Sequence, residues 1–195
     1  MSTLRLLSGL TLALGATLPV HAQGAMRAAL SSRASTEVSL TLVDSAARAA
    51  AKPSVIRVEY GQPHLRGRAL HTDSLVPYDK VWRLGANGAT MLTTDVDVLL
   101  GGVVIAKGTY VLQALPSRAG WKLLVQTPGG SAMADAMAYD PAKDVARIDL
   151  TRSVLAVPVE SLTFWLIPSR DAGPPKGELR LQWGTVSLST TWSVK

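Results

Sequence analysis

Short runs of alternating apolar and polar residues dominate the chain beyond residue 35. Glu37–Val43 and Ser54–Tyr60 each alternate with a period of two, the pattern of a half-buried β-strand. Further β-type runs stand between turn residues at Val96–Leu100, Val103–Ala106, Thr109–Leu115, Trp121–Gln126, Asp144–Thr151, Ser161–Ile167, Glu178–Trp183 and Val186–Val194. The pair Gly101-Gly102 suits the two-residue turns that match strand twist, so it predicts a hairpin.

Helical signals are weak by comparison. Ala46–Ala51 has helical propensity but is short and ends before Pro53. Residues 127–143 are rich in Gly, Ala and Met, and we expect an irregular segment there of the kind that is often functional or mobile. About ten strands without crossover helices predict an all-β fold, an antiparallel sandwich or barrel. We expect one β-domain over residues 36–195.

The N-terminus has the pattern of an export signal. Arg5 precedes an apolar run over Leu6–Leu18, and Val20-His21-Ala22 offers small residues for cleavage. The run is shorter than the roughly 20 apolar residues of a spanning helix. We therefore expect a cleaved signal peptide over residues 1–22, no stable membrane insertion afterwards, and a periplasmic or extracellular protein. Residues 23–35 lack aromatic residues, and we expect a flexible or weakly helical lead-in.

Composition narrows the class of partner. The chain has no cysteine, so packing without disulfides must stabilise the exported domain. The formal net charge is +6, which favours loose attraction to anionic surfaces such as acidic polysaccharide or lipid headgroups; a merely solvated basic surface is the alternative. No interleaving of basic and aromatic residues forms a stacking platform for bases, so we expect no nucleic-acid partner.

The most specific segment is Leu75–Thr90, which sets Trp82, Arg83 and the sole asparagine, Asn87, among apolar residues. Its Val-Pro-Tyr…Val-Trp-Arg…Gly-Ala-Asn run, with Gly61-Gln62-Pro63-His64-Leu65-Arg66-Gly67-Arg68 before it and Gly101-Gly102…Gly108-Thr109-Tyr110 after it, resembles a family of exported bacterial β-domains of unknown function. The resemblance extends over roughly Glu37–Lys195, with a weaker echo at Tyr139-Asp140…Asp144-Val145-Ala146-Arg147. It implies no catalytic residues, because the family has none established.

Two interpretations of Arg83 remain open. If Val81–Leu84 is a strand, Trp82 and Arg83 point to opposite faces. In the first interpretation the guanidinium makes an internal tie to a carboxylate, for which the candidates nearest in sequence are Glu59, Asp73, Asp79 and Asp95. In the second, Arg83 lies in a cleft and binds an anionic or polyhydroxylated ligand.

The second interpretation defines a candidate ligand-binding site. Trp82 or Tyr78 would serve as a stacking plate, and Asn87 would supply a hydrogen-bond donor and acceptor. The complete set of candidate ligand-binding residues is Tyr78, Trp82, Arg83, Asn87, His64 and Arg66. Asn87-Gly88 also matches a hairpin turn between two apolar runs, so a purely conformational role is the alternative for that asparagine.

Other chemistry has little support in the sequence. His64, His71 and Asp73 follow no known metal-ligand spacing, so we expect no metal. The sequence contains no nucleophile elbow, zinc-protease motif or nucleotide-binding motif, so we expect no cofactor. We expect a non-catalytic domain that binds a small molecule or a cell-envelope glycan. A hydrolase of envelope polymers remains an alternative, with Glu59 and Asp97 or Glu160 as acid–base pairs. The other alternative is an assembly partner that docks through an exposed strand edge.

Overall fold

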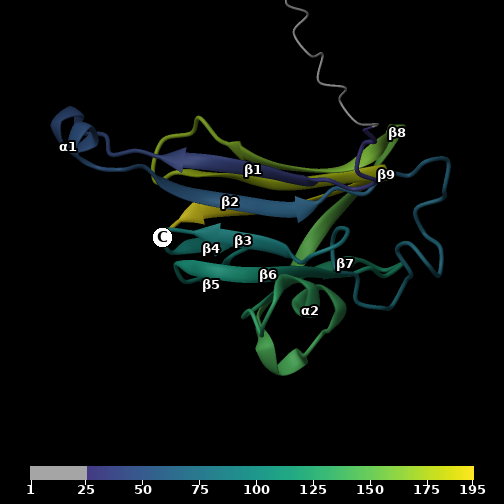
Figure 1. Ribbon diagram of the computed structural model, residues 1–195. Coiled ribbons are helices and arrows are strands. Elements are labelled where there is room, and N and C mark those ends of the chain that lie inside the picture. The colour runs from purple at the N-terminus through teal and green to yellow at the C-terminus, as the bar shows by residue number, and fades with distance from the viewer. Residues whose placement is uncertain (1–25) are drawn as a thin grey trace, which may run out of the picture.

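The computed structural model describes residues 26–195 as one curled, nine-stranded antiparallel sheet (Figure 1). Its strand order is β1-β2-β3-β6-β7-β8-β9-β4-β5. The predicted all-β, sandwich-like fold is confirmed, with nine strands in place of about ten. The expected signal peptide at residues 1–22 lies outside the described residues.

The sheet bends so that its two halves face each other across one core. One half contains β1 (Arg33–Leu40), β2 (Ser54–Gly61), β3 (Thr90–Thr94), β6 (Gly108–Leu115), β7 (Trp121–Gln126) and the start of β8 (Asp144–Pro168). The other contains the rest of β8, β9 (Lys176–Val194), β4 (Val98–Leu100) and β5 (Val103–Ile105). β8 runs obliquely from one half to the other, as Figure 1 shows.

The two longest strands were predicted as four shorter ones. In β9 the buried positions change from odd numbers, such as Leu181 and Trp183, to even numbers, such as Val186 and Leu188. Gly184 lies between them with φ 57°, and the pairing of β8 with β9 shifts register there. A bulge of this kind keeps the strand continuous but reverses which residues face the core. The alternation of buried residues is therefore interrupted at Gly184 although β9 continues, which is why one strand was predicted as two.

Other predictions about strands had mixed outcomes. The hairpin at Gly101-Gly102 is confirmed, because β4 pairs with β5 and both glycines have positive φ, 56° and 82°. β3 was missed. Two of its three inward residues are Thr90 and Thr94, whose hydroxyls donate to the carbonyls of Leu84 and Val96 at 2.8 and 2.7 Å. Threonine on the core face conceals the alternation that marks a strand.

The termini of elements also differ from the sequence expectations. β1 begins at Arg33, so the end of the expected lead-in is ordered strand, and β1 ends at Leu40 rather than Val43. The segment 127–143 is less irregular than expected, because it contains α2 (Ala132–Met137) and a 3-10 turn, η1 (Pro141–Lys143). The helix α1 (Ser45–Ala50) stands out beyond β1 and β2 (Figure 1). Within residues 26–195, no helix has the length and apolar character needed to cross a membrane.

Three tryptophans form the centre of the core beneath the segment 75–90. Trp82 stacks on Trp183 with ring centroids 5.7 Å apart and meets Trp121 edge-on at 6.3 Å. All three side chains are buried, and aromatic pairs at such spacings add to the stabilisation from burial. The chain on either side of Trp82 is thereby fixed to the core.

Candidate functional site

A surface hollow of about 590 Å³ lies over this tryptophan cluster, and we call it the arginine cleft. Its charged and amide side chains are Arg66, Arg68, Asp73, Arg83 and Asn87. Trp82, Trp183 and Met137 are among its apolar lining residues. The volume is within the range of small-ligand sites, about 300 to 1,000 Å³. Four of the six candidate residues therefore line one hollow.

The segment that carries Trp82 and Arg83 is not the strand that the sequence suggested. Only Trp82 forms a bridge, donating its N–H to the Ala114 carbonyl at 2.7 Å and accepting from the Ala114 N–H at 2.9 Å. The next turn leaves the extended conformation, because Leu84 has φ 56°. The opposite orientation of the two side chains survives this correction: Trp82 is buried in the core and Arg83 is half-buried at the cleft wall.

Arg83 has no carboxylate partner in the described part of the chain. None of the candidates Glu59, Asp73, Asp79 and Asp95, nor any other acidic residue within 26–195, forms an ion pair with it. Its Nη1 instead lies 3.5 Å from the sulfur of Met137 in α2. The first interpretation, an internal tie to a carboxylate, is therefore wrong, and most hydrogen-bonding capacity of this guanidinium is available to a ligand.

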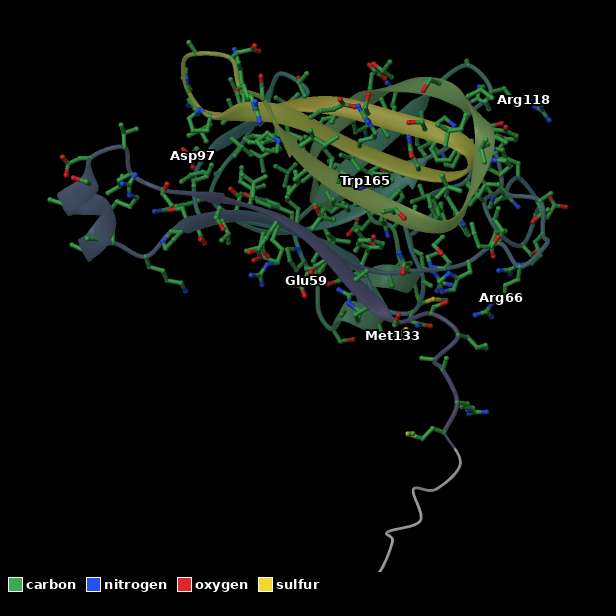
Figure 2. All side chains as sticks on the ribbon, turned by 90° about the horizontal axis from the view of Figure 1, so that it is seen from above. Glu59, Arg66, Asp97, Arg118, Met133 and Trp165 are labelled. Carbon is green, nitrogen blue, oxygen red and sulfur yellow. The ribbon has the colours of Figure 1, made fainter. Side chains whose placement is uncertain are left out.

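Arg66 and Arg68 complete a cationic wall. The Arg66 backbone, at φ 53°, is held by the Glu160 carboxylate, which accepts its N–H at 2.6 Å, while its guanidinium donates to the Leu30 carbonyl. Arg68 donates to the carbonyls of Leu65 and His64 at 2.9 and 2.7 Å. Figure 2 shows Arg66 on the side of the molecule where the chain enters β1. Carbonyl partners orient the guanidinium groups without neutralising their charge.

Asn87 has both a conformational feature and a contact. Its φ of 61° is one that asparagine tolerates better than most residues. No strand immediately precedes Asn87-Gly88, and the Ala89 N–H donates to the Ala132 carbonyl at 2.8 Å, so the pair does not form the predicted hairpin turn. The Asn87 side chain is exposed, and its Nδ2 donates to the Ser31 carbonyl at 2.9 Å.

Two candidate residues lie outside the cleft. Tyr78 stacks on His71 with ring centroids 4.2 Å apart, and the Arg118 guanidinium lies 4.8 Å from the Tyr78 ring centroid. With both neighbours in place, Tyr78 does not serve as a stacking plate for a ligand in the cleft. His64 lies at a bridge to β8, with Nδ1 2.7 Å from the Ser161 hydroxyl.

Sequence reasoning missed several lining residues. Arg68 had a signal, because it lies two residues beyond Arg66 in the same polar stretch. Met137 and Trp183 had none, since they reach the cleft from α2 and β9. α2 is held there by Gln113, whose Nε2 donates to the carbonyls of Asp135 and Ala138 at 3.1 and 3.0 Å.

The weaker motif at residues 139–147 forms a polar brace at the end of the 127–143 segment. Asp144 accepts hydrogen bonds from the Gln126 amide at 2.7 Å, the Tyr139 hydroxyl at 2.9 Å and the Arg147 guanidinium at 2.6 Å. Burial alone raises the pKa of Asp144, but these three hydrogen bonds and the positive charge of Arg147 outweigh it and lower the pKa below the usual value. Because Gln126, Tyr139 and Arg147 all bond to Asp144, we interpret the brace as a structural support.

No three histidine, aspartate or glutamate side chains in residues 26–195 gather closely enough to hold a metal ion. Among the residues that the structure describes, Asp73 contributes the only carboxylate to the lining of the arginine cleft. The cleft's chemistry is therefore that of hydrogen-bond donors and positive charge.

Comparison with known proteins places the chain among proteins that share this uncharacterised domain. The model of the family described as "Protein of unknown function (DUF2911)" matches residues 44–191. No curated protein and no solved structure matches the chain.

Proposed function

The chain belongs to the DUF2911 family of proteins of unknown function, and from that premise we propose that it is a non-catalytic domain whose arginine cleft binds an anionic ligand. The favoured ligand class is an acidic glycan fragment of the cell envelope. One observation carries the proposal: Arg66, Arg68 and Arg83 line one hollow, and none of their guanidinium groups forms an ion pair with a carboxylate of residues 26–195.

The charge balance of the cleft supports an anion. Three guanidinium groups stand against the single carboxylate of Asp73. A carboxylate or sulfate bound there would accept charge-assisted hydrogen bonds, which are roughly twice as strong as those between neutral groups. The formal net charge of +6 adds a long-range attraction for anionic ligands.

The apolar lining supports a ligand with carbon-rich faces. Met137 is exposed and Leu75, Pro77 and Val81 are half-buried at the cleft, so a ring packed against them would bury apolar surface, while Trp82 and Trp183 lie buried beneath. Asn87 adds both a donor and an acceptor of the kind that hydroxyl and acetamido groups require. A sugar ring with an acidic substituent combines these features, whereas a bare inorganic anion uses only the arginines.

The alternative functions have less support in this geometry. Glycoside hydrolysis requires two carboxyl groups about 5 to 10 Å apart, and Asp73 is alone in the cleft. Figure 2 shows Glu59 and Asp97 in separate parts of the molecule, and the Glu160 carboxylate accepts the Arg66 backbone N–H. For docking through a strand edge, β1 is partly covered by the hydrogen bond from the Leu166 N–H to the Thr36 hydroxyl, and β5 has three residues.

A matched pair of sugars tests the proposal. N-acetylglucosaminyl-N-acetylmuramic acid carries a lactyl carboxylate that N,N′-diacetylchitobiose lacks. We expect the acidic disaccharide to raise the melting temperature of the protein, through preferential binding to the folded state, and the neutral one to have a much smaller effect. Trigalacturonate and inorganic phosphate extend the series to other carboxylates and to a bare anion. Equal responses to the acidic and neutral sugars would refute the electrostatic basis of the site.

A further inference from the structure

The chain's own N-terminal segment touches the arginine cleft. Residues 26–31, which we call the strap, precede β1, and Leu30 and Ser31 belong to the cleft lining. The Leu30 carbonyl accepts a hydrogen bond from the Arg66 guanidinium, and the Ser31 carbonyl accepts one from Asn87 Nδ2 at 2.9 Å. Two of the polar side chains that face a ligand are thus occupied by main-chain carbonyls of the strap.

The position of the strap is set by the residues that follow it. The Ser32 carbonyl accepts the Gln62 N–H at 2.9 Å, and Arg33 Nη1 donates to the Ala89 carbonyl at 3.1 Å. From Arg33 onward the chain is paired with β2. The strap is therefore tethered at the edge of the cleft whether or not its own two contacts are formed.

The strap itself is held weakly. Residues 26–30 are exposed, and no strap side chain makes a hydrogen bond or ion pair within residues 26–195. Segments with few buried contacts and exposed hydrogen bonds open at low free energy. A carboxylate is also a stronger acceptor for a guanidinium than a neutral carbonyl is. Exchange of the Leu30 carbonyl for an anion would therefore strengthen the hydrogen bonding of the Arg66 guanidinium.

We propose that the strap is a built-in competitor that occupies Arg66 and Asn87 in the ligand-free protein and is displaced when the anionic ligand binds. This inference rests on the proposed function of the cleft. The apparent affinity is then the intrinsic affinity reduced by the fraction of molecules whose strap is undocked. Two hydrogen bonds of ordinary net strength correspond to a reduction of roughly thirtyfold.

Spin labels in the full chain test displacement directly. Because the chain has no cysteine, a nitroxide attached to Ala28→Cys reports on the strap alone, and one attached to Val43→Cys is a control at an exposed site. We expect N-acetylglucosaminyl-N-acetylmuramic acid to increase the mobility of the label at position 28, over the concentration range of binding measured by calorimetry, and to leave position 43 unchanged. Binding without a change at position 28 would overturn the competition and leave the proposed function standing. Absence of binding would overturn both.

Two sets of variants add independent readouts. Arg66→Ala with Asn87→Ala should mobilise the label at position 28 without any ligand, and an unchanged spectrum would show that these side chains do not hold the strap. Leu30→Gly with Ser31→Gly keeps both carbonyls but increases the entropy lost on docking, so the affinity for the disaccharide should rise severalfold. Ser169→Gly with Arg170→Gly, in an exposed loop, is the matched control and should leave affinity unchanged. Equal affinities in both double-glycine variants would contradict the proposal.

Discussion

The indole of Trp82 and the guanidinium of Arg83 extend from adjacent residues into different environments. Trp82 is 7 % exposed and stacks on Trp183 at 5.7 Å, whereas Arg83 is half-buried and reaches the Met137 sulfur at 3.5 Å. One residue therefore belongs mainly to the core and its neighbour mainly to the cleft. Substitutions at the two positions should separate stability from binding.

Truncation of Trp82 should destabilise the fold strongly. Trp82→Ala removes a buried indole from between two other tryptophans, and we expect a loss of about 3 to 5 kcal/mol in the free energy of unfolding measured in urea. Arg83→Gln should change that free energy by about 0.5 kcal/mol or less, because the guanidinium has no ion pair to lose within residues 26–195. Similar losses for the two variants would contradict the division of roles.

Gly61 is required by close contact between two backbone segments. A Cβ added there would lie 1.8 Å from the Ala86 carbonyl oxygen, and the Ala86 N–H donates to the Gly61 carbonyl at 3.0 Å. Gly61→Ala should therefore force the 84–87 turn away from β2 and cost about 1 to 3 kcal/mol of stability. Gly120→Ala is the control, since no atom beyond its own residue and its two chain neighbours lies within 4 Å of its Cβ position. A Gly61→Ala variant as stable as Gly120→Ala would refute this contact.

His71 should make stability dependent on pH. Its Nδ1 lies 3.1 Å from the Val76 carbonyl, which only accepts, so Nδ1 carries the proton of the neutral ring; Nε2 is buried without a partner in residues 26–195. Burial lowers the pKa of His71 below 6.5, the bond to Val76 opposes the shift, and the charges of Arg152 and Arg118 add to it.

The sign of the His71 effect follows from proton uptake. The unfolded chain binds a proton near pH 6.5 and the folded ring does so only at lower pH, so stability falls as the pH drops below 6.5 and levels off once the folded ring is protonated. His71→Gln keeps a donor for Val76 but does not titrate. Urea unfolding at about pH 7.5 and about pH 5 should show a smaller difference for the variant than for the unchanged protein. Parallel pH profiles would disprove the assignment.

Asp144 should act in the opposite range of pH. Its lowered pKa means that the brace stabilises the fold fully above pH 3.8 and loses this stabilisation as the pH falls from 3.8 through the folded value. Asp144→Asn should cost about 1 to 3 kcal/mol at neutral pH, because it weakens the hydrogen bonds from Tyr139 and Arg147. The difference from the unchanged protein should shrink below about pH 3. A cost that does not vary with pH would show that the charge of Asp144 is irrelevant.

The sequence predicted those elements in which local pattern and tertiary environment agree. β2 alternates because one face is buried, whereas β6 and β7 are short apolar runs that are buried on both faces over residues 111–114 and 123–126. Gly101-Gly102 forms its turn because glycine readily adopts the positive φ that the turn requires. β3 and the bulge at Gly184 were missed, because inward threonines and a register shift obscure the pattern. These features depend on the partner strand, which a local pattern does not contain.

The site was predictable to the extent that it is local. Arg66, Trp82, Arg83 and Asn87 meet because the loops that carry them are close in sequence. The partners that decide the roles of Tyr78 and His64, an Arg118 guanidinium and a Ser161 hydroxyl, come from other parts of the fold. Composition alone does not specify such pairings.

The most direct test of the anion-binding cleft is calorimetric titration of N-acetylglucosaminyl-N-acetylmuramic acid into three proteins: the unchanged chain, Arg83→Gln, and Arg170→Gln as an exposed arginine outside the cleft. We expect affinity to fall about tenfold or more for Arg83→Gln, the equivalent of one lost charge-assisted hydrogen bond, and to be unchanged for Arg170→Gln. Equal affinities for all three proteins, or no measurable binding by the unchanged chain, would contradict the account.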